Sequence, residues 1–211
     1  MTAHPIVSAI LVTRRPTFLA GAVAMMRAQT YPGVELVVVL HGLDMAELPD
    51  PAVEALALAD RVLEVPTSVP FGTCLNLGIA ASRGEMLAKI DDDDLYGPAY
   101  LAEAAAAFAA GEGDVVGKME TYVFLSDDRQ LLLWRPGASL QRQSGLAGPT
   151  LFFPRRLGEA PGFRPLPSAI DRGFLTDCKA QGCHFYSTSR RHYVLRRMPA
   201  ANHHTWQTAN D

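Results

Sequence analysis

The four consecutive aspartates at residues 91–94 are the part of this chain whose residue types and spacing are best suited to chemistry. They follow residues 86–90, a mostly apolar segment typical of a short buried strand, with Lys89 as the exception. Because strand side chains alternate between faces, Asp91 and Asp93 would share one side if the extended geometry continues. Adjacent carboxylates repel each other unless a cation or hydrogen-bond donors meet them, and Mg²⁺ or Mn²⁺ takes such oxygen ligands. The alternative, a solvated acidic turn in front of a helix, fits these residues about equally well.

The segments around the aspartates alternate between strand-like and helix-like patterns. Apolar runs predict strands at residues 6–12, 35–40, 61–65 and 86–90, and helical patterns lie at residues 18–29, 51–59, 73–81 and 98–110. Thr17 and Thr73 are the expected N-caps of two of these helices. Strand, helix and strand in this order form a βαβ unit, so the pattern predicts an α/β fold. Its central sheet would be mostly parallel, with helices on both faces.

After Asp114 the pattern changes to short strands joined by turns. These strands are expected at residues 115–116, 121–125, 131–134, 150–153, 184–187 and 193–197, with a hairpin loop at 126–130 and a helix at 171–181. No repeat, low-complexity tract or clear linker interrupts the chain. We therefore expect one domain, residues 1–211, whose halves are about 1–113 and about 114–211, the second being a small mixed region.

Composition narrows the class of protein. The chain has 211 residues, of which 48% are hydrophobic, and this is enough to build a core. Its formal net charge of −3 argues against a nucleic-acid binder, which would carry a basic excess. Positive charge is nevertheless concentrated in three late arginine pairs, which either face phosphates or are solvated: Arg155 and Arg156, Arg190 and Arg191, and Arg196 and Arg197.

The cysteines and the N-terminus indicate a cytoplasmic protein. Three cysteines without metal-site spacing suggest reduced thiols. The first residues lack the features of a signal peptide, and no apolar run is long enough for a transmembrane segment. Work at the inner face of a membrane is left open, and alanine and arginine richness with few lysines hints at a bacterial source.

Five segments of the first half form an ordered series that resembles a known family. They are Ser8 to Pro16, Gln29 to Pro32, Glu35 to Val39, Leu75 to Glu85 and Ile90 to Asp94. In this order they are similar to the family 2 glycosyltransferases of the GT-A fold, and the series is far more specific than any single motif. The resemblance implies a Rossmann-like sheet whose first half binds a nucleotide-sugar and whose second half faces the acceptor.

The resemblance also implies which residues hold the nucleotide of the donor: Thr13, Arg14, Arg15, Asn76 and Arg83. Gly78 belongs to the same segment as Asn76. Each has a plainer alternative: a helix-entry loop for the first three, close packing for Gly78 and ordinary surface for Arg83.

The acidic run matches the family's DXD motif, which implies that Asp91 lies near the ribose and that Asp93 binds Mn²⁺ or Mg²⁺ bridging the diphosphate. Asp92 is indicated less strongly as a donor-binding residue, and Asp94 would instead cap the helix that follows. By the same resemblance, His203 and His204 near the C-terminus are further metal ligands, although tail histidines are commonly solvated.

Two substitutions depart from the family pattern. Leu40 stands where an acid usually contacts the base, and His41 beside it is an alternative partner for base or ribose. Uracil is therefore in doubt, and UDP-, GDP- and dTDP-linked donors stay open. Ile170 replaces the first acid of a Glu-Asp pair, and Asp171 would be the general base, with helix N-cap as its plainer role.

On the acceptor side, Gly148 and Thr150 match a stretch that crosses the sheet near the acceptor, and Trp134 is suited to stacking on a sugar ring. The acceptor would be a sugar, a lipid-linked molecule or a small molecule, and a homodimer is left open.

We interpret the chain as a metal-dependent, inverting glycosyltransferase. A degenerate GT-A binding protein is the first alternative, favoured by Leu40 and Ile170. A nucleotidyltransferase is the second, but residues 12–16 lack the glycine-rich loop that those enzymes carry.

Overall fold

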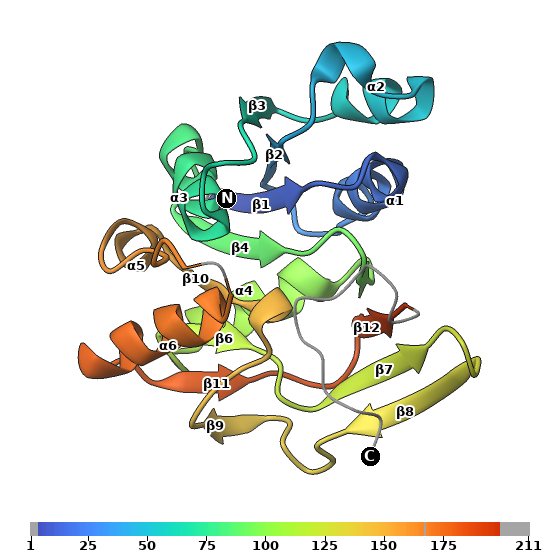
Figure 1. Ribbon diagram of the computed structural model, residues 1–211. Helices are drawn as coiled ribbons and strands as arrows, with labels where there is room; N and C mark the ends of the chain where they lie inside the picture. The colour runs from blue at the N-terminus through green and yellow to red at the C-terminus, as the bar shows by residue number, and fades with distance from the viewer. Residues whose placement is uncertain (1–3, 167, 199–211) are drawn as a thin grey trace.

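The computed structural model describes residues 4–166 and 168–198, and these residues form an α/β structure around two sheets (Figure 1). The larger sheet has eight strands in the order β3-β2-β1-β4-β10-β6-β11-β9, and the smaller has four in the order β5-β12-β7-β8. Pairing is parallel among β3, β2, β1 and β4, whereas β10 runs antiparallel to both of its neighbours. The predicted fold class, a mostly parallel sheet followed by a smaller mixed region, is confirmed.

The first half alternates strands and helices. Its elements are β1 (Val7–Thr13), α1 (Pro16–Arg27), β2 (Val34–His41), η1 (Met45–Glu47), α2 (Asp50–Leu56), β3 (Arg61–Val65), α3 (Phe71–Ala81), β4 (Met86–Ile90), β5 (Leu95–Tyr96) and α4 (Tyr100–Ala109).

Short strands dominate the second half. Its elements are β6 (Val115–Gly117), β7 (Thr121–Leu125), β8 (Gln130–Trp134), β9 (Gln141–Gln143), η2 (Gly148–Thr150), β10 (Phe152–Pro154), α5 (Arg155–Glu159), α6 (Ile170–Ala180), β11 (Phe185–Ser187) and β12 (Tyr193–Arg197).

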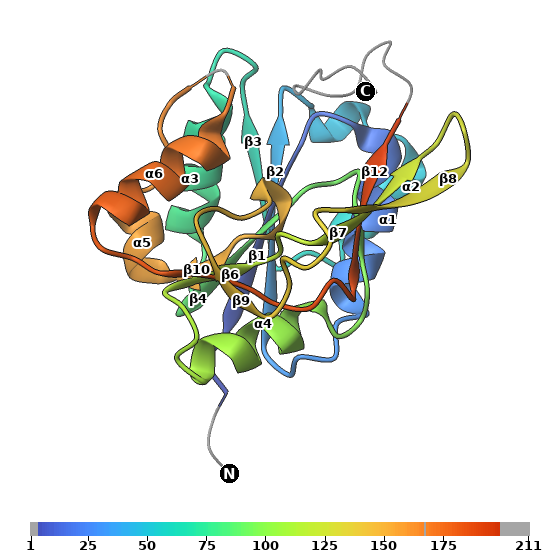
Figure 2. The ribbon, with the colours of Figure 1, turned by 90° about the horizontal axis from the view of Figure 1, so that it is seen from below.

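Helices cover both faces of the large sheet, and each face has its own core (Figure 2). Alternation along β1 explains this: Val7, Ala9 and Leu11 pack with α1, α2 and α4, while Ile10 and Val12 pack with α3, α5 and α6. A central parallel strand buried on both faces reads as a continuous apolar run, which is the pattern of this segment. The sheet is thus clamped between two hydrophobic layers.

The strand order has a switch point at β1, which singles out the edge of the sheet formed by the carboxyl ends of its parallel strands. β1 lies between β2 and β4, so the chain's crossovers leave β1 in opposite directions. In open parallel sheets, the crevice for ligands lies at such a switch point, outside the carboxyl ends of the strands. Here those ends are Thr13 of β1, His41 of β2 and Ile90 of β4.

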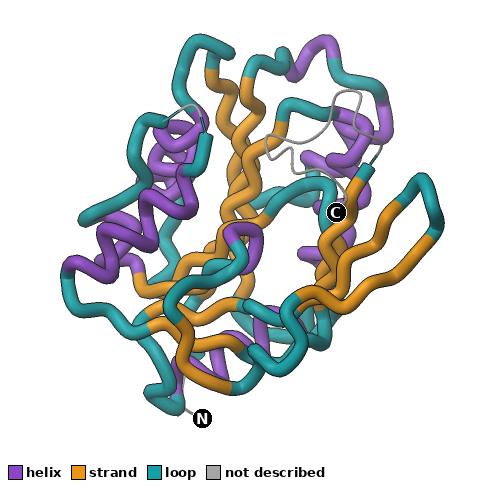
Figure 3. The backbone as a smooth tube through the Cα atoms, turned by 60° about the horizontal axis from the view of Figure 1, so that its bottom comes forward, coloured by secondary structure: helices purple, strands orange, loops and turns teal. Residues whose placement is uncertain are grey.

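The smaller sheet packs beside this edge (Figure 3). One buried aspartate ties the two together. Asp94 accepts a hydrogen bond from Tyr193 Oη at 2.6 Å and one from the backbone N–H of Arg196 at 3.0 Å. Both donors lie on β12. The last aspartate of the acidic run therefore holds the smaller sheet in place, and it does not cap the next helix, whose N-cap is Ala99.

Several expected helix ends are corrected. Helix α1 begins at Pro16, after Arg15 as N-cap, and α3 begins at Phe71, after Pro70, so neither Thr17 nor Thr73 is an N-cap. Proline preorganises a first turn, which explains why α1 starts earlier than its apolar pattern. The strands β5 and β9 and the short helix α5 were missed, because segments of two to five residues carry no clear periodicity.

In the chain as far as it is described, no helix is both long and apolar enough to cross a membrane.

The first prediction concerns the close packing of α3 on the sheet. A Cβ built on Gly78 would lie 2.7 Å from Ile10 Cγ2 and 3.1 Å from Val39 Cγ2, whereas one on Gly21 of α1 meets nothing within 4 Å. Gly78→Ala should overpack the core and lower the free energy of unfolding by about 1–3 kcal/mol. Gly21→Ala, the matched control, should raise it by up to about 1 kcal/mol through helix propensity.

Urea unfolding of both variants measures the difference. Equal stability of Gly78→Ala and Gly21→Ala would contradict the packing of α3 against β1 and β2.

Candidate active site

A network of charge-assisted hydrogen bonds joins the carboxyl ends of β1 and β4. Thr13 Oγ1 donates to Asp92 Oδ2, and the Arg15 guanidinium pairs with Asp92 and, at 2.9 Å, with Asp93 Oδ2. Asp92 and Asp93 are both buried. The loop that enters α1 thus supplies the cation that the acidic run requires, and the structure brings Thr13, Arg15, Asp92 and Asp93 together.

Burial and charge shift the pKa values of this network. Burial raises the pKa of Asp92, and the hydrogen bonds from Arg15 and Thr13 oppose the rise. For Arg15, burial works against the charged form, but its bonds to Asp92 and Asp93 outweigh this and raise its pKa. The guanidinium therefore stays protonated and holds the two carboxylates in fixed positions.

Lys89 joins the acidic run to helix α6. Its side chain is buried inside β4, and its Nζ lies 2.5 Å from Asp91 Oδ1 and 3.4 Å from Asp171 Oδ1. Burial lowers the pKa of Lys89, and the charges of Asp171 and Asp91 more than compensate, so the net shift is upward. Sequence reasoning missed this role, although a lysine inside a buried apolar strand was the available signal.

Asp171 occupies the first turn of α6, after Ala169 as N-cap, so the N-cap alternative for Asp171 is wrong. Its Oδ1 is buried without a hydrogen bond among the described residues, while the side chain as a whole is 29% exposed. Burial raises the pKa of this carboxyl, and the charge of Lys89 lowers it. Gly148 lies directly against Oδ2, since a Cβ there would come within 2.1 Å. Only a glycine leaves room for this carboxylate.

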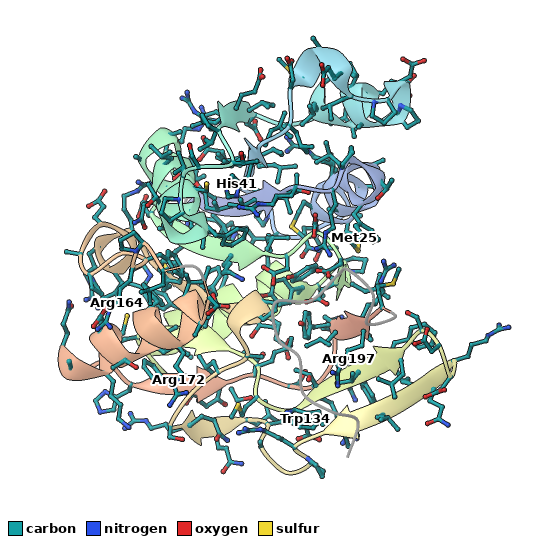
Figure 4. All side chains as sticks on the ribbon, viewed as in Figure 1. Met25, His41, Trp134, Arg164, Arg172 and Arg197 are labelled. Carbon is teal, nitrogen blue, oxygen red and sulfur yellow. The ribbon has the colours of Figure 1, made fainter. Side chains whose placement is uncertain are left out.

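A second corner of the edge is built from the loop after β1, the end of β2 and the start of α3. Arg14 donates from Nε to His41 Nδ1 at 3.0 Å, and its Nη2 lies 3.0 Å from His41 Nε2. His41, labelled in Figure 4, is buried. Burial together with the charge of Arg14 lowers the pKa of its imidazole, so the ring is neutral near pH 7. Phe71 lies beside the imidazole, with ring centroids 6.2 Å apart. This corner offers an aromatic surface and a cation at the end of β2.

One of the late arginine pairs reaches the same edge. Arg196 of β12 stacks over the Phe18 ring at 5.5 Å from its centroid, and Arg15 stacks over the same ring at 4.9 Å. Arg196 Nε is buried without a hydrogen-bond partner among the described residues. An unsatisfied buried donor beside a second guanidinium suits an anion. The other pairs do not reach this edge: Arg155 donates to the backbone carbonyls of Ile79 and Gly84, and Arg190 pairs with Glu120.

Two predicted donor-binding residues are not brought to this edge. Asn76 of α3 makes two hydrogen bonds to the backbone of Phe163, at 2.8 and 2.9 Å, and so fixes the loop before α6. Arg83 is 63% exposed and contacts Glu35 near the start of β2, at the opposite end of the sheet. The alternative interpretation of Arg83 as an ordinary surface residue agrees with this position. Arg83 follows α3 and precedes β4, so it lies far from the carboxyl ends of the strands.

The two departures from the family pattern are core residues. Leu40 is fully buried and packs with α1 and α2, and Ile170 is buried with α3 and α5. Their side chains therefore do not face the strand-end crevice, and His41 is the residue of β2 that meets Arg14 there.

A cavity of about 900 Å³ opens beside Asp171, with Gly148 in its wall. Thr150 is buried, and its hydroxyl donates to Ala147 O at 2.7 Å and accepts from the N–H of Lys118 at 2.9 Å. Trp134 ends β8 with half of its surface exposed, next in sequence to Arg135, which lines the cavity.

No three potential ligands among His, Cys, Asp and Glu gather into a metal cluster within residues 4–166 and 168–198. His203 and His204, predicted as metal ligands, lie outside the described residues. Asp93 fits a hard divalent cation by chemistry, because it offers carboxylate oxygen beside the carboxyl end of β4 and such ions complete their shells with donor phosphates and water.

Comparison with known proteins identifies the family. The profile of "Glycosyl transferase family 2" matches residues 9–174, which is most of the chain, so the chain belongs to that family. The curated proteins contain no match.

Solved structures show the same fold. The mannosyltransferase PcManGT from Pyrobaculum calidifontis, in complex with GDP-Man and Mn²⁺, is 19% identical with a TM-score of 0.68, covering 95% of this chain and 59% of that one. Residues 1–349 of S. aureus TarS, in complex with UDP-GlcNAc, are 18% identical with a TM-score of 0.68, covering 92% and 59%. This chain thus spans about three fifths of the structures that it resembles.

The second prediction tests the buried ion pairs of Lys89. Lys89→Met would leave the largely buried carboxylates of Asp91 and Asp171 without their cation, and the free energy of unfolding should fall by about 3–5 kcal/mol. Lys179→Met, on the exposed side of α6, is the control and should change it by no more than about 0.5 kcal/mol.

Adding Asp171→Asn to Lys89→Met should recover part of the loss, which a double-mutant cycle in urea would quantify. Equal stability of Lys89→Met and Lys179→Met would contradict the described pairing.

Proposed function

We propose that this chain transfers a sugar from a nucleotide-sugar donor to an acceptor hydroxyl, with Asp171 as general base and inversion at the anomeric carbon. The observation that carries the proposal is the Lys89 bridge, which holds Asp91 of the strand-end crevice and Asp171 of the cavity on one ammonium group. Two carboxylates from distant segments thus meet where a donor site and an acceptor site adjoin. We further propose that the two halves act as one domain, the first for the donor and the second for the acceptor.

The donor would lie across the carboxyl ends of β1, β2 and β4. Arg14, His41 and Phe71 offer the base a cation, a neutral imidazole and an aromatic ring. Asp91 would accept hydrogen bonds from the ribose. Arg15 and Arg196 share the Phe18 ring beside the acids, and their guanidinium groups suit the diphosphate.

A divalent cation would be held by Asp93 together with the diphosphate. Mg²⁺ or Mn²⁺ bound there supplies positive charge that stabilises the leaving nucleoside diphosphate. PcManGT, which shares the fold, was solved in complex with both GDP-Man and Mn²⁺, and this supports a metal-dependent donor site here. Arg15 already binds Asp93 Oδ2, so it would share that carboxylate with the metal or turn towards the phosphates.

Asp171 would accept the proton of the acceptor hydroxyl as its oxygen attacks the anomeric carbon. Burial raises the pKa of Asp171 and so makes the carboxylate a stronger base, while the charge of Lys89 opposes this rise. One displacement of this kind inverts the sugar and needs no covalent intermediate. That Leu40 and Ile170 belong to the core favours an enzyme over a degenerate binding protein, since neither substitution removes a carboxylate from the described site.

The third prediction concerns donor binding. UDP, GDP or dTDP with Mn²⁺ should raise the melting temperature, and at 100 times the dissociation constant the stabilisation is about 2.7 kcal/mol. Asp93→Asn should abolish the metal-dependent part of the shift, because an amide is a poor ligand for a hard cation. Asp128→Asn, an exposed aspartate of the β7–β8 loop, is the matched control and should respond like the wild type.

Thermal shift with each nucleotide, with Mn²⁺ or with EDTA, provides the measurement. A shift of equal size for Asp93→Asn and wild type would show that Asp93 is not the metal ligand.

The fourth prediction separates the base from donor binding. Asp171→Asn should reduce kcat for transfer by about 10²–10⁴-fold, since the hydroxyl loses its proton acceptor. The nucleotide-dependent melting shift of the same variant should persist. Full transfer activity in Asp171→Asn, measured as release of nucleoside diphosphate with acceptor present, would overturn the assignment.

A further inference from the structure

The cavity beside Asp171 is lined by an uneven set of charges. Three cationic side chains, Arg135, Arg172 and Lys179, contribute to its wall, and Asp171 is the single acid among the described residues that line it. A smaller neighbouring hollow of about 160 Å³ shares Lys179 with the cavity and adds Arg142, and no acid is among the described residues that line it. Since Asp171 is paired with Lys89 in the protein interior, the open part of the cavity is positively charged.

Helix geometry explains why two of these cations face the same space. Arg172 and Lys179 are seven residues apart on α6, about two turns, and Thr176 between them lines the same cavity. Arg135 comes from the other side, directly after β8, and its Nη1 lies 3.8 Å from Met119 Sδ, another residue of the wall. Figure 4 labels Arg172 on α6 and Trp134 at the end of β8. The cations therefore converge from two separate elements.

These cations differ from the other arginines near α6. Arg164 pairs with Asp177 at 2.5 Å, and Arg190 pairs with Glu120 at 2.9 Å. Among the ion pairs of the described residues, none includes Arg135, Arg172 or Lys179. Like charges gathered around a concave surface raise the local concentration of anions.

We propose that the acceptor of this enzyme is anionic, and that Arg135, Arg172 and Lys179 bind a phosphate or carboxylate group that it carries near the reacting hydroxyl. The inference rests on the proposed function and adds the chemical class of the acceptor. Guanidinium groups bind phosphate and carboxylate through paired hydrogen bonds, and an ammonium adds a point charge. The cations also offset the repulsion that Asp171 exerts on an anionic acceptor, so the hydroxyl can approach the base.

Three monosaccharide probes test whether the acceptor is anionic: glucose 6-phosphate, glucuronate and neutral glucose. Their binding to the full chain is measured by saturation-transfer NMR at fixed salt. We expect at least one anionic probe to bind at least tenfold more tightly than glucose, and the tighter of the two identifies phosphate or carboxylate. The double variant R172Q/K179Q should lose at least tenfold in that affinity. R61Q, at the start of β3 and half-exposed, is the control for loss of a surface charge and should bind as the wild type does.

Equal binding of glucose and both anions, unchanged binding in R172Q/K179Q, or an equal loss in R61Q would overturn the inference. The nucleotide-dependent melting shift of R172Q/K179Q, recorded on the same samples, separates the two proposals. A shift that persists while the anions fail to bind to the wild type contradicts the acceptor class alone. Anion binding without any nucleotide shift in the wild type contradicts the transferase function and leaves an anion site.

Discussion

Four adjacent carboxylates follow β4, and the partners that neutralise them organise both halves of the chain. Without partners, Asp91 to Asp94 would repel one another in a region largely withdrawn from water. Lys89 pairs with Asp91, Arg15 pairs with Asp92 and Asp93, and Tyr193 donates to Asp94. These partners come from β4, from the loop entering α1 and from β12.

That division of partners ties the two halves of the chain together. Burial, followed by the charge of Asp91, raises the pKa of Asp94 to about 8, and the hydrogen bonds that Asp94 accepts from Tyr193 and from the N–H of Arg196 on β12 oppose this rise. Lys89 extends from the acidic run to Asp171 and fixes the first turn of α6. The carboxyl ends of the strands and the cavity beside Asp171 are therefore positioned by the same few ion pairs, and a change in one should affect the other.

The α/β alternation and the acidic strand end could be predicted from the sequence, because long apolar runs and a charged break are local signals. The role of Lys89 could not, since its partner Asp171 is 82 residues away and only the sheet topology brings them together. Arg83 shows the reverse: the family resemblance implied that it binds the donor, yet it follows α3 and contacts Glu35 at the opposite end of the sheet. The cations of the cavity were missed because α6 and the end of β8 meet only in the folded chain.

Sugar transfer is tested most directly by following the donor itself with ³¹P NMR, with UDP-, GDP- and dTDP-linked sugars as probes and Mg²⁺ or EDTA in the sample. We predict that the protein converts one donor, slowly with water and faster with an acceptor, to nucleoside diphosphate, and that EDTA stops this release. Phosphorus signals that neither shift nor decay in the presence of the protein and Mg²⁺, for all three kinds of donor alike, would contradict the proposed transfer.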